Sequence, residues 1–302
     1  MTHAILTRNL AYRASAHFHV RELSLAVPRG AVYGFLGPNG SGKTTTIRLL
    51  LGLLRPLGGD IEVLGDPMPD AAPTVLARVG YVPERPHIYP TLTVDEAMRF
   101  HAAFHKQWDP TWAKDLAATF MLRSDSRVGT LSKGEMGKLM MLLALGQRPE
   151  LLVLDEPTDG LDPVVRRDML ESVLGYVAEQ GATVFISSHL VHELERICDW
   201  VGVMDRGRLV AELPMQTFKD GIKRLHVTGG SGEMTGSPFV LLKREPNGGS
   251  GEQWTVSGWK PGMQSYIEGT GAAVREIVDL DLEDGFVEML RAARVSPAKE
   301  EV

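Results

Sequence analysis

The chain has 302 residues, of which 43% are hydrophobic, and this length suits one large domain plus a small one, because a single core stops growing near ~250–300 residues. Its net charge of −6 argues against sequence-independent binding to nucleic acid, which usually needs a basic surface. Cys198 is the only cysteine, which excludes an internal disulfide and favours a reducing compartment. No apolar run reaches the ~18 residues that a membrane span needs, and the first residues lack the apolar core of a signal peptide. We therefore expect a soluble chain that reaches a membrane only through a partner.

Residues 1–30 predict two short strands joined by a turn, and a second turn at residues 28–30 precedes the next strand. Tyr12 ends the first of these strands. Its ring can pack on the core or stack on a planar ligand ring such as adenine, and its place in a strand favours core packing when no other motif is considered.

A glycine-rich segment follows an apolar strand at residues 31–36 and opens a run with helical apolar spacing. Residues 37–44 fit the phosphate-binding pattern G-x-x-x-x-G-K-[ST]. Glycines let backbone N–H groups approach phosphates closely, and the helix N-terminus adds a partial positive charge there. We expect Lys43 to bridge the β- and γ-phosphates of a nucleotide and the Thr44 hydroxyl to bind Mg²⁺. The predicted nucleotide contacts are Gly37, Pro38, Asn39, Gly40, Ser41, Gly42, Lys43, Thr44 and Thr45.

The middle of the chain alternates strands with helices. A predicted strand at residues 79–84 ends at the carboxylate of Glu84. Residues 91–123 then show helical apolar spacing after a capping box, with a break at residues 108–110. The next helix opens with a second capping box, Ser132 and Glu135, and runs to about residue 147 with a methionine-rich apolar face that we assign to core packing.

Residues 151–156 are four apolar residues followed by Asp155 and Glu156. A continuous apolar run is typical of a central parallel strand covered on both faces, and ligands of open α/β sheets bind at the carboxyl ends of such strands. An aspartate at this position can hold Mg²⁺, and a neighbouring carboxylate can orient and polarise an attacking water. A helix over residues 163–179 and a buried strand at residues 183–186, ending in Ser-Ser-His189, follow.

From about residue 222 the glycine and serine content rises, and short strands alternate with helical segments. The predicted order is strand, strand, strand, helix, strand, helix, with the last helix over residues 282–293. That order indicates a small α+β domain, in which we identify no residues with chemistry of their own.

Six short motifs in a fixed order resemble those of the ATP-binding subunits of ABC transporters, and the resemblance covers residues 5–210. They are the phosphate loop at 37–44, Tyr-Val-Pro-Glu at 81–84, Leu-Ser-Lys-Gly-Glu at 131–135, the strand and acids at 151–157, Gly-Leu-Asp-Pro at 160–163 and Ser-His at 188–189. The motif at residues 131–135, called the signature segment below, distinguishes this family from kinases, GTPases and helicases with the same phosphate loop.

The resemblance implies an α/β fold with a phosphate-loop NTPase core of the ABC ATPase type. This core has a mixed sheet, an N-terminal antiparallel β part and a helical signature subdomain at about residues 85–148. It would occupy residues 1–220, and residues 221–302 would form the small α+β accessory domain. The resemblance also implies that two such domains close head to tail around two ATP molecules. Each ATP would then lie between the phosphate loop of one chain and the signature segment of the other.

Residue roles follow from the same resemblance. Glu156 would be the general base, while Lys43 and His189 would contact the γ-phosphate. Mg²⁺ would be held by Thr44, Glu84 and Asp155. The further contacts to ATP would come from Tyr12, Ser132, Gly134, Glu135 and Asp162. Tyr12 would stack on adenine, which replaces the core packing favoured from its strand position alone. Asp162 would link the two sites.

Two positions depart from the family pattern. Glu84 stands where the family usually has Gln, and it keeps the ability to ligate Mg²⁺ with more charge. In the signature segment, Lys133 and Glu135 replace two members of the usual Leu-Ser-Gly-Gly-Gln, while Ser132 and Gly134 are kept. Lys133 can add a cation near the phosphates or be solvated, and we favour the solvated alternative because most lysines lie at the surface.

Within the family, the motifs look like those of ABC-2-type exporter ATPases for drug, antibiotic-peptide or polysaccharide efflux. The resemblance implies a membrane permease on a separate chain, a second copy or a paralogue as the dimer partner, and a location at the cytoplasmic face of the cell membrane. No nucleic-acid partner is expected. The alternative is a soluble ABC ATPase that acts as a regulator or on ribosomes or DNA; such relatives usually carry two ATPase modules or a coiled-coil insertion.

His101 and His105 are four residues apart in a predicted helix, a spacing that can hold a metal ion. The sequence offers no third ligand nearby, so we expect them on an exposed or partner-facing helix instead.

Overall fold

The computed structural model describes residues 2–14, 18–229, 236–248 and 251–295. The chain forms two compact units. The first comprises Met1–Leu190 and Gly202–Leu209, and the second comprises Val191–Val201 and Val210–Val302. Among the described residues, none of the helices combines the length and the apolar character needed to cross a bilayer.

The first unit begins with an antiparallel sheet organised around its longest strand, β1 (His3–Arg13). The strand order is β2-β1-β5-β6, and β3 also pairs with β1. Residues on β1 such as Ile5 and Leu10 are fully buried, so this sheet has a core face of its own. The other strands are β2 (His19–Leu23), β3 (Ala26–Pro28), β5 (Gly58–Val63) and β6 (Asp66–Met68).

A six-stranded sheet has the order β11-β10-β4-β9-β8-β7. Its strands are β4 (Val32–Leu36), β7 (Val79–Val82), β8 (Leu151–Asp155), β9 (Thr183–Ser188), β10 (Trp200–Asp205) and β11 (Arg208–Pro214). β4, β9, β8 and β7 run parallel, and every residue of β4, β8 and β9 is buried, as the continuous apolar runs predict.

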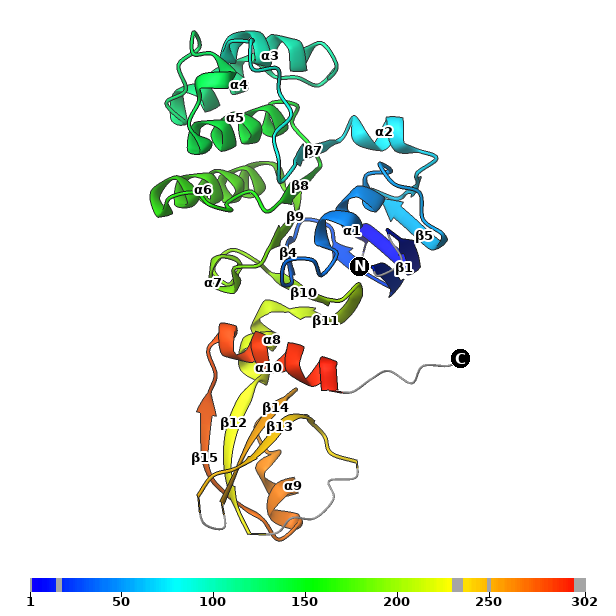
Figure 1. Ribbon diagram of the computed structural model, residues 1–302, viewed down its shortest axis with the longest axis vertical. Coiled ribbons are helices and arrows are strands. Elements are labelled where there is room, and N and C mark those ends of the chain that lie inside the picture. The colour runs from blue at the N-terminus through cyan, green and yellow to red at the C-terminus, as the bar shows by residue number, and fades with distance from the viewer. Residues whose placement is uncertain (1, 15–17, 230–235, 249–250, 296–302) are drawn as a thin grey trace. The chain divides into compact units, whose positions relative to one another are not determined.

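Helices α3, α4 and α5 gather together beyond the β7 end of this sheet (Figure 1). The predicted break at residues 108–110 is confirmed, because α4 starts at Pro110, while α3 already ends at Ala102. Asp109 caps α4 and Pro110 occupies its first turn, and both features favour a new helix start over continuation of α3. The helices are α1 (Lys43–Leu50), α2 (Ala72–Leu76), α3 (Val94–Ala102), α4 (Pro110–Thr119), the 3₁₀ turn η1 (Val128–Thr130), α5 (Lys133–Leu145) and α6 (Pro163–Gln180).

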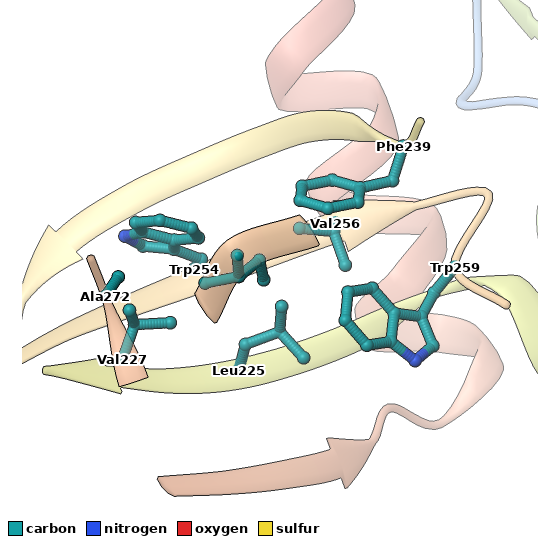
Figure 2. Close-up of a cluster of buried hydrophobic side chains, with 8 residues drawn as sticks. Leu225, Val227, Phe239, Trp254, Val256, Trp259 and Ala272 are labelled. Atoms are coloured by element: carbon teal, nitrogen blue, oxygen red, sulfur yellow. The ribbon is translucent and has the colours of Figure 1, made fainter. Parts of the chain in front are cut away.

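The second unit holds a four-stranded antiparallel sheet with the order β13-β14-β12-β15. The predicted order of strands and helices in this part of the chain is confirmed. Alternate residues of β12 point into a core that includes Leu225, Trp254 and Trp259 (Figure 2). The elements are α7 (Val191–Leu194), α8 (Met215–Gly221), β12 (Lys223–Thr228), β13 (Val240–Pro246), β14 (Gly251–Ser257), α9 (Gln264–Gly269), β15 (Ala273–Asp279) and α10 (Leu282–Val295).

Candidate active site

The carboxyl ends of β4, β8 and β9 meet at one edge of the parallel sheet. The strand register pairs Asp155 with Ser187 and Leu36 with Ser188, so the segments that follow these strands start side by side. A pocket of about 490 Å³ lies at this edge. It is lined by Phe18, Asn39, Gly40, Gly42, Lys43, Thr44, Thr45, Glu84, Glu156, Asp159 and His189.

The phosphate loop has glycine where the backbone cannot accept a side chain. A Cβ on Gly42 would lie 2.7 Å from Phe18 Cζ, and the φ of +115° at Gly42 is one that other residues rarely adopt. A Cβ on Gly37 would collide with the Met204 carbonyl. Ser41, within the loop, is itself buried. The loop is therefore held open as a backbone cradle at the start of α1.

Lys43 lies at the first turn of α1 with its ammonium turned back over the loop. Its Nζ donates to the carbonyls of Gly37 at 2.7 Å and Pro38 at 3.3 Å. It also forms a 3.0 Å ion pair with Glu156, and both side chains are at least nine-tenths buried. A buried ammonium needs such partners, so Lys43 is held in one place at the mouth of the cradle.

Asp155 ends β8 and is fully buried. Its Oδ1 accepts hydrogen bonds from Thr44 Oγ1 at 3.1 Å and Ser187 Oγ at 2.9 Å. Burial raises the pKa of this carboxyl, the two hydroxyl donors oppose that shift, and the neighbouring carboxylates of Glu84 and Glu156 add to it.

The other oxygen of Asp155, Oδ2, is buried and has no hydrogen-bond partner among the described residues. A buried carboxylate oxygen beside a hydroxyl and a second carboxylate, Glu84, is the hard-oxygen set that Mg²⁺ prefers. The described parts of the chain contain no group of three or more His, Cys, Asp or Glu that could hold a metal alone. The residues present therefore fit a magnesium ion that also takes oxygen ligands from a nucleotide.

Glu156 directly follows Asp155 and adopts a left-handed backbone conformation, with φ of +49°. Its backbone N–H donates to Ser187 Oγ at 3.0 Å, which fixes this conformation from the next strand. The carboxylate lies 2.9 Å from His189 Nδ1 and accepts a 3.3 Å hydrogen bond from the His189 backbone N–H. Such strained residues often occur at functional sites, and here the strain turns a carboxylate toward Lys43 and His189.

The signature segment opens α5 with the capping box that the sequence predicts. Glu135 N–H donates to Ser132 Oγ, and the Glu135 carboxylate accepts from the Ser132 N–H and hydroxyl, both at 2.8 Å. The backbone N–H and then the hydroxyl of Ser132 lower the pKa of Glu135, so this carboxylate is charged. None of Ser132, Gly134 and Glu135 is among the residues that line the pocket of their own chain.

Two other predicted contacts also lie away from the pocket. Asp162 caps α6 and accepts hydrogen bonds from the N–H groups of Val164 and Val165, at 3.0 and 3.1 Å. Tyr12 lines a separate hollow of about 460 Å³. The aromatic residue that the structure brings to the phosphate loop is Phe18, which the sequence reasoning missed.

Asp159 and Ser187 were missed as well. Asp159 lines the pocket, and Ser187 holds both acids at the end of β8. Two signals in the sequence point to them: Asp159 lies between the predicted residues Glu156 and Asp162, and Ser187 ends the strand that leads to His189.

His101 and His105 do not share a helix, because α3 ends at Ala102. Their rings stack with centroids 4.7 Å apart, and His101 also meets the edge of Trp108. Burial, followed by the charge of His105, lowers the pKa of His101 to about 4. The pair is partly buried rather than fully exposed, and it packs between α3 and the segment before α4.

Comparison with known proteins identifies the family of this chain. The ABC transporter family model matches residues 20–159. The chain is 36% identical over 221 residues to the bacitracin transport ATP-binding protein BcrA of Bacillus licheniformis, covering 72% of each protein. It is 40% identical over 210 residues to a Nod factor export ATP-binding protein I of Burkholderia lata, covering 68% of this chain and 69% of that one.

The solved structures agree on the fold. One of them, the structure of an ATP-binding subunit of an ABC transporter, superposes with a TM-score of 0.65 at 29% identity, over 72% of this chain and 92% of that one. On the identity and coverage of these relatives, the chain belongs to the ABC transporter family as an ATP-binding subunit.

Proposed function

We propose that this chain hydrolyses Mg-ATP in a head-to-tail dimer and thereby drives a separate membrane permease that exports its substrate. ABC transporter ATP-binding subunits are ATPases coupled to transport, and this chain is one of them. The observation that carries the proposal is the network in which Glu156 meets both Lys43 and His189 at the mouth of the phosphate cradle.

Hydrolysis would use these side chains as follows. The triphosphate would bind in the cradle. The ammonium of Lys43 would then pair with the β- and γ-phosphate oxygens in place of the Glu156 carboxylate. The freed Glu156 carboxylate accepts a proton from a water whose oxygen attacks the γ-phosphorus, and the bond from that phosphorus to the β,γ-bridging oxygen breaks, so that ADP leaves. His189 steadies the carboxylate and the γ-phosphate through its ring. Thr44, Asp155 and Glu84 would hold Mg²⁺, which supplies charge neutralisation on the phosphate oxygens.

A second copy, or a paralogue, would complete the site. Ser132 and Gly134 lie at the start of α5 and do not line the pocket of their own chain. The first turn of a helix offers free N–H groups to an anion, so this end of α5 suits a γ-phosphate held by another chain. Asp162, at the start of α6, would face the same interface.

The first experiment compares Glu156→Gln with wild type by light scattering, with and without Mg-ATP. The variant should trap ATP, and its kcat should fall by a factor on the order of 10²–10⁴, the usual contribution of a general base. A monomer that becomes a dimer only with ATP supports two equivalent sites in a homodimer. Glu171→Gln is the matched control, because Glu171 is an exposed carboxylate on α6 and its loss should leave turnover unchanged.

Turnover of Glu156→Gln at the wild-type rate would contradict the assignment of the base. A variant that stays monomeric with ATP would require a paralogue or the permease, and a dimer without ATP would place the dimer contact outside the nucleotide sites.

The permease would dock on an aromatic surface formed by residues that follow Glu84 in the chain. Tyr89, Phe100 and Phe104, called the aromatic ladder below, meet edge to face with ring centroids 5.8 and 5.1 Å apart. Their exposed fractions are 64%, 48% and 71%. Large aromatic rings that contact one another in water are typical of a protein interface, where their burial provides much of the binding energy.

Membrane recruitment tests this surface. Vesicles from cells that co-express the cognate permease should sediment wild-type protein, and Phe104→Asp should leave it in the supernatant while its ATPase activity without membranes is unchanged. Leu57→Asp is the control, since Leu57 is an equally exposed apolar residue in the N-terminal part of the first unit. Equal sedimentation of both variants would exclude the aromatic ladder as the docking surface.

The names of the relatives support export as the direction of transport. They include a bacitracin transport ATP-binding protein and Nod factor export ATP-binding proteins. We propose an export substrate for this chain as well, bound by the permease and not by the ATPase, and a position at the cytoplasmic face of the membrane. We further propose residues 221–302 as an accessory domain.

A further inference from the structure

Lys133, one of the two residues that depart from the family pattern in the signature segment, is exposed as predicted and also lies within reach of a carboxylate. It occupies the first turn of α5, and its ammonium lies 3.7 Å from the Asp159 carboxylate of the same chain. The same Nζ sits against Gly160, where an added Cβ would collide with it. The side chain thus reaches from the signature segment across to the loop that follows Glu156.

This reach is possible because α5 and α6 pack closely. A Cβ on Gly134 would touch Val165 at 3.4 Å, and one on Gly137 would touch Met169 at the same distance. Two glycines on one face of α5 therefore let its first turns approach the start of α6 and the loop before it.

Asp159 lies where its charge matters for a nucleotide. It lines the phosphate pocket, and its N–H donates to the Glu156 carbonyl at 3.2 Å. Glu84 and Glu156 line the same pocket, so among its described lining residues three are carboxylates and one, Lys43, is a lysine. A triphosphate entering this pocket would be repelled by an unpaired Asp159.

We propose that Lys133 is the counter-ion of Asp159, and that it positions this carboxylate at the pocket rim so that ATP binds without repulsion from it. Lys133 is a positioning residue in this role, acting in cis through Asp159. The inference rests on the proposed function only in taking the pocket as the ATP site. It differs from a contact between Lys133 and the phosphates of a partner chain, which would act only in the dimer.

The test measures ATP affinity in the monomer. Without Mg²⁺, at a concentration where light scattering gives a monomer, the Kd for ATP should rise about 1.5- to 5-fold in Lys133→Ala, the range expected for an exposed ion pair. Lys133→Arg should retain wild-type affinity. In the Asp159→Asn background, Lys133→Ala should leave the Kd for ATP unchanged, because the negative charge of Asp159 that repels ATP is already absent.

Two further measurements separate the alternatives. The loss of ATP affinity in Lys133→Ala should be smaller at 0.5 M salt. The side chains of Lys133 and Asp159 are both more than half exposed, so salt screens their interaction. Arg123→Ala is the matched control, because it removes one positive charge and breaks an exposed ion pair, with Asp125, that lies outside the pocket. It should leave the Kd unchanged.

The proposal is overturned if Lys133→Ala binds ATP like wild type, or if its loss persists in the Asp159→Asn background. A defect seen only in the dimer would assign Lys133 to the partner's nucleotide instead. Failure of the proposed function would give a different result. Wild type would then not bind ATP in this pocket, and Lys43→Ala would have the same affinity for ATP as wild type.

Discussion

The stacked histidine pair predicts an acid-sensitive first unit. His101 has an ordinary pKa near 6.5 in the unfolded chain, and burial lowers it to about 4 in the fold. Between these values the unfolded chain binds more protons than the folded one. Stability should therefore fall as the pH falls from about 6.5 to about 4, and the loss should level off below that.

The size of the effect follows from the same two values. Without screening, the lowered pKa of His101 would reduce the unfolding free energy by about 2 kcal/mol at pH 5. Over the whole range from pH 6.5 to below pH 4 the reduction would reach about 3 kcal/mol. The ring is only partly buried, so water at its edge screens part of this. We expect about 1–2 kcal/mol at pH 5.

His101→Phe isolates this contribution, because phenylalanine keeps an aromatic ring against His105 and Trp108 but cannot titrate. Hydrogen exchange of peptides covering α3 and α4, measured for both proteins at the same pH, reports the local opening free energy. The local opening free energy of the variant, relative to that of wild type, should rise by about 1–2 kcal/mol when the pH is lowered from 8 to 5. An identical difference at the two pH values would refute the argument from burial.

Three further predictions concern the cradle, the signature helix and the second unit. Gly42→Ala should abolish measurable ATP binding, because its Cβ would meet Phe18 and its φ is left-handed; calorimetry that still detects binding would contradict the cradle geometry. Ser132→Ala should cost about 1 kcal/mol of local stability by removing the cap of α5, read from amide exchange in its first turns, and unchanged exchange would mean that the capping box contributes nothing. Trp254→Ala should destabilise the second unit by about 3–5 kcal/mol, seen in urea unfolding, and a loss below 1 kcal/mol would show that the core collapses around the missing ring.

Short-range patterns predict most of this site. The phosphate loop, the acids after an apolar strand and the histidine at the next strand end each carry a local signal, and parallel pairing brings strand ends to one edge. The register of β8 against β9 then places Asp155 beside Ser187, as this edge rule requires. Both predicted capping boxes form because an N-cap depends on residues only three positions apart.

Contacts set by tertiary packing were beyond reach. The approach of Lys133 to Asp159 depends on the close packing of α5 and α6, which no periodicity reveals. Phe18 reaches the phosphate loop from the N-terminal sheet, where the sequence offered Tyr12 as the obvious aromatic. The break before Pro110 was predicted from the sequence, but the end of α3 at Ala102 was not, because apolar spacing continues across residues whose backbone turns away from helix.

The path of the chain through the two units constrains how the protein can be engineered. Residues 191–201 belong with the C-terminal part, yet they are encoded before Gly202–Leu209, which return to the first unit. Within the second unit, the Met215 N–H donates to the Asp199 carbonyl, and Lys219 pairs with Glu195. A single stop codon therefore cannot remove this unit alone. Any truncation would leave α7 in the chain, with its buried Val191 and Leu194 separated from the residues they pack against. Grafting the C-terminal part onto another ATPase would require two segments to be exchanged together.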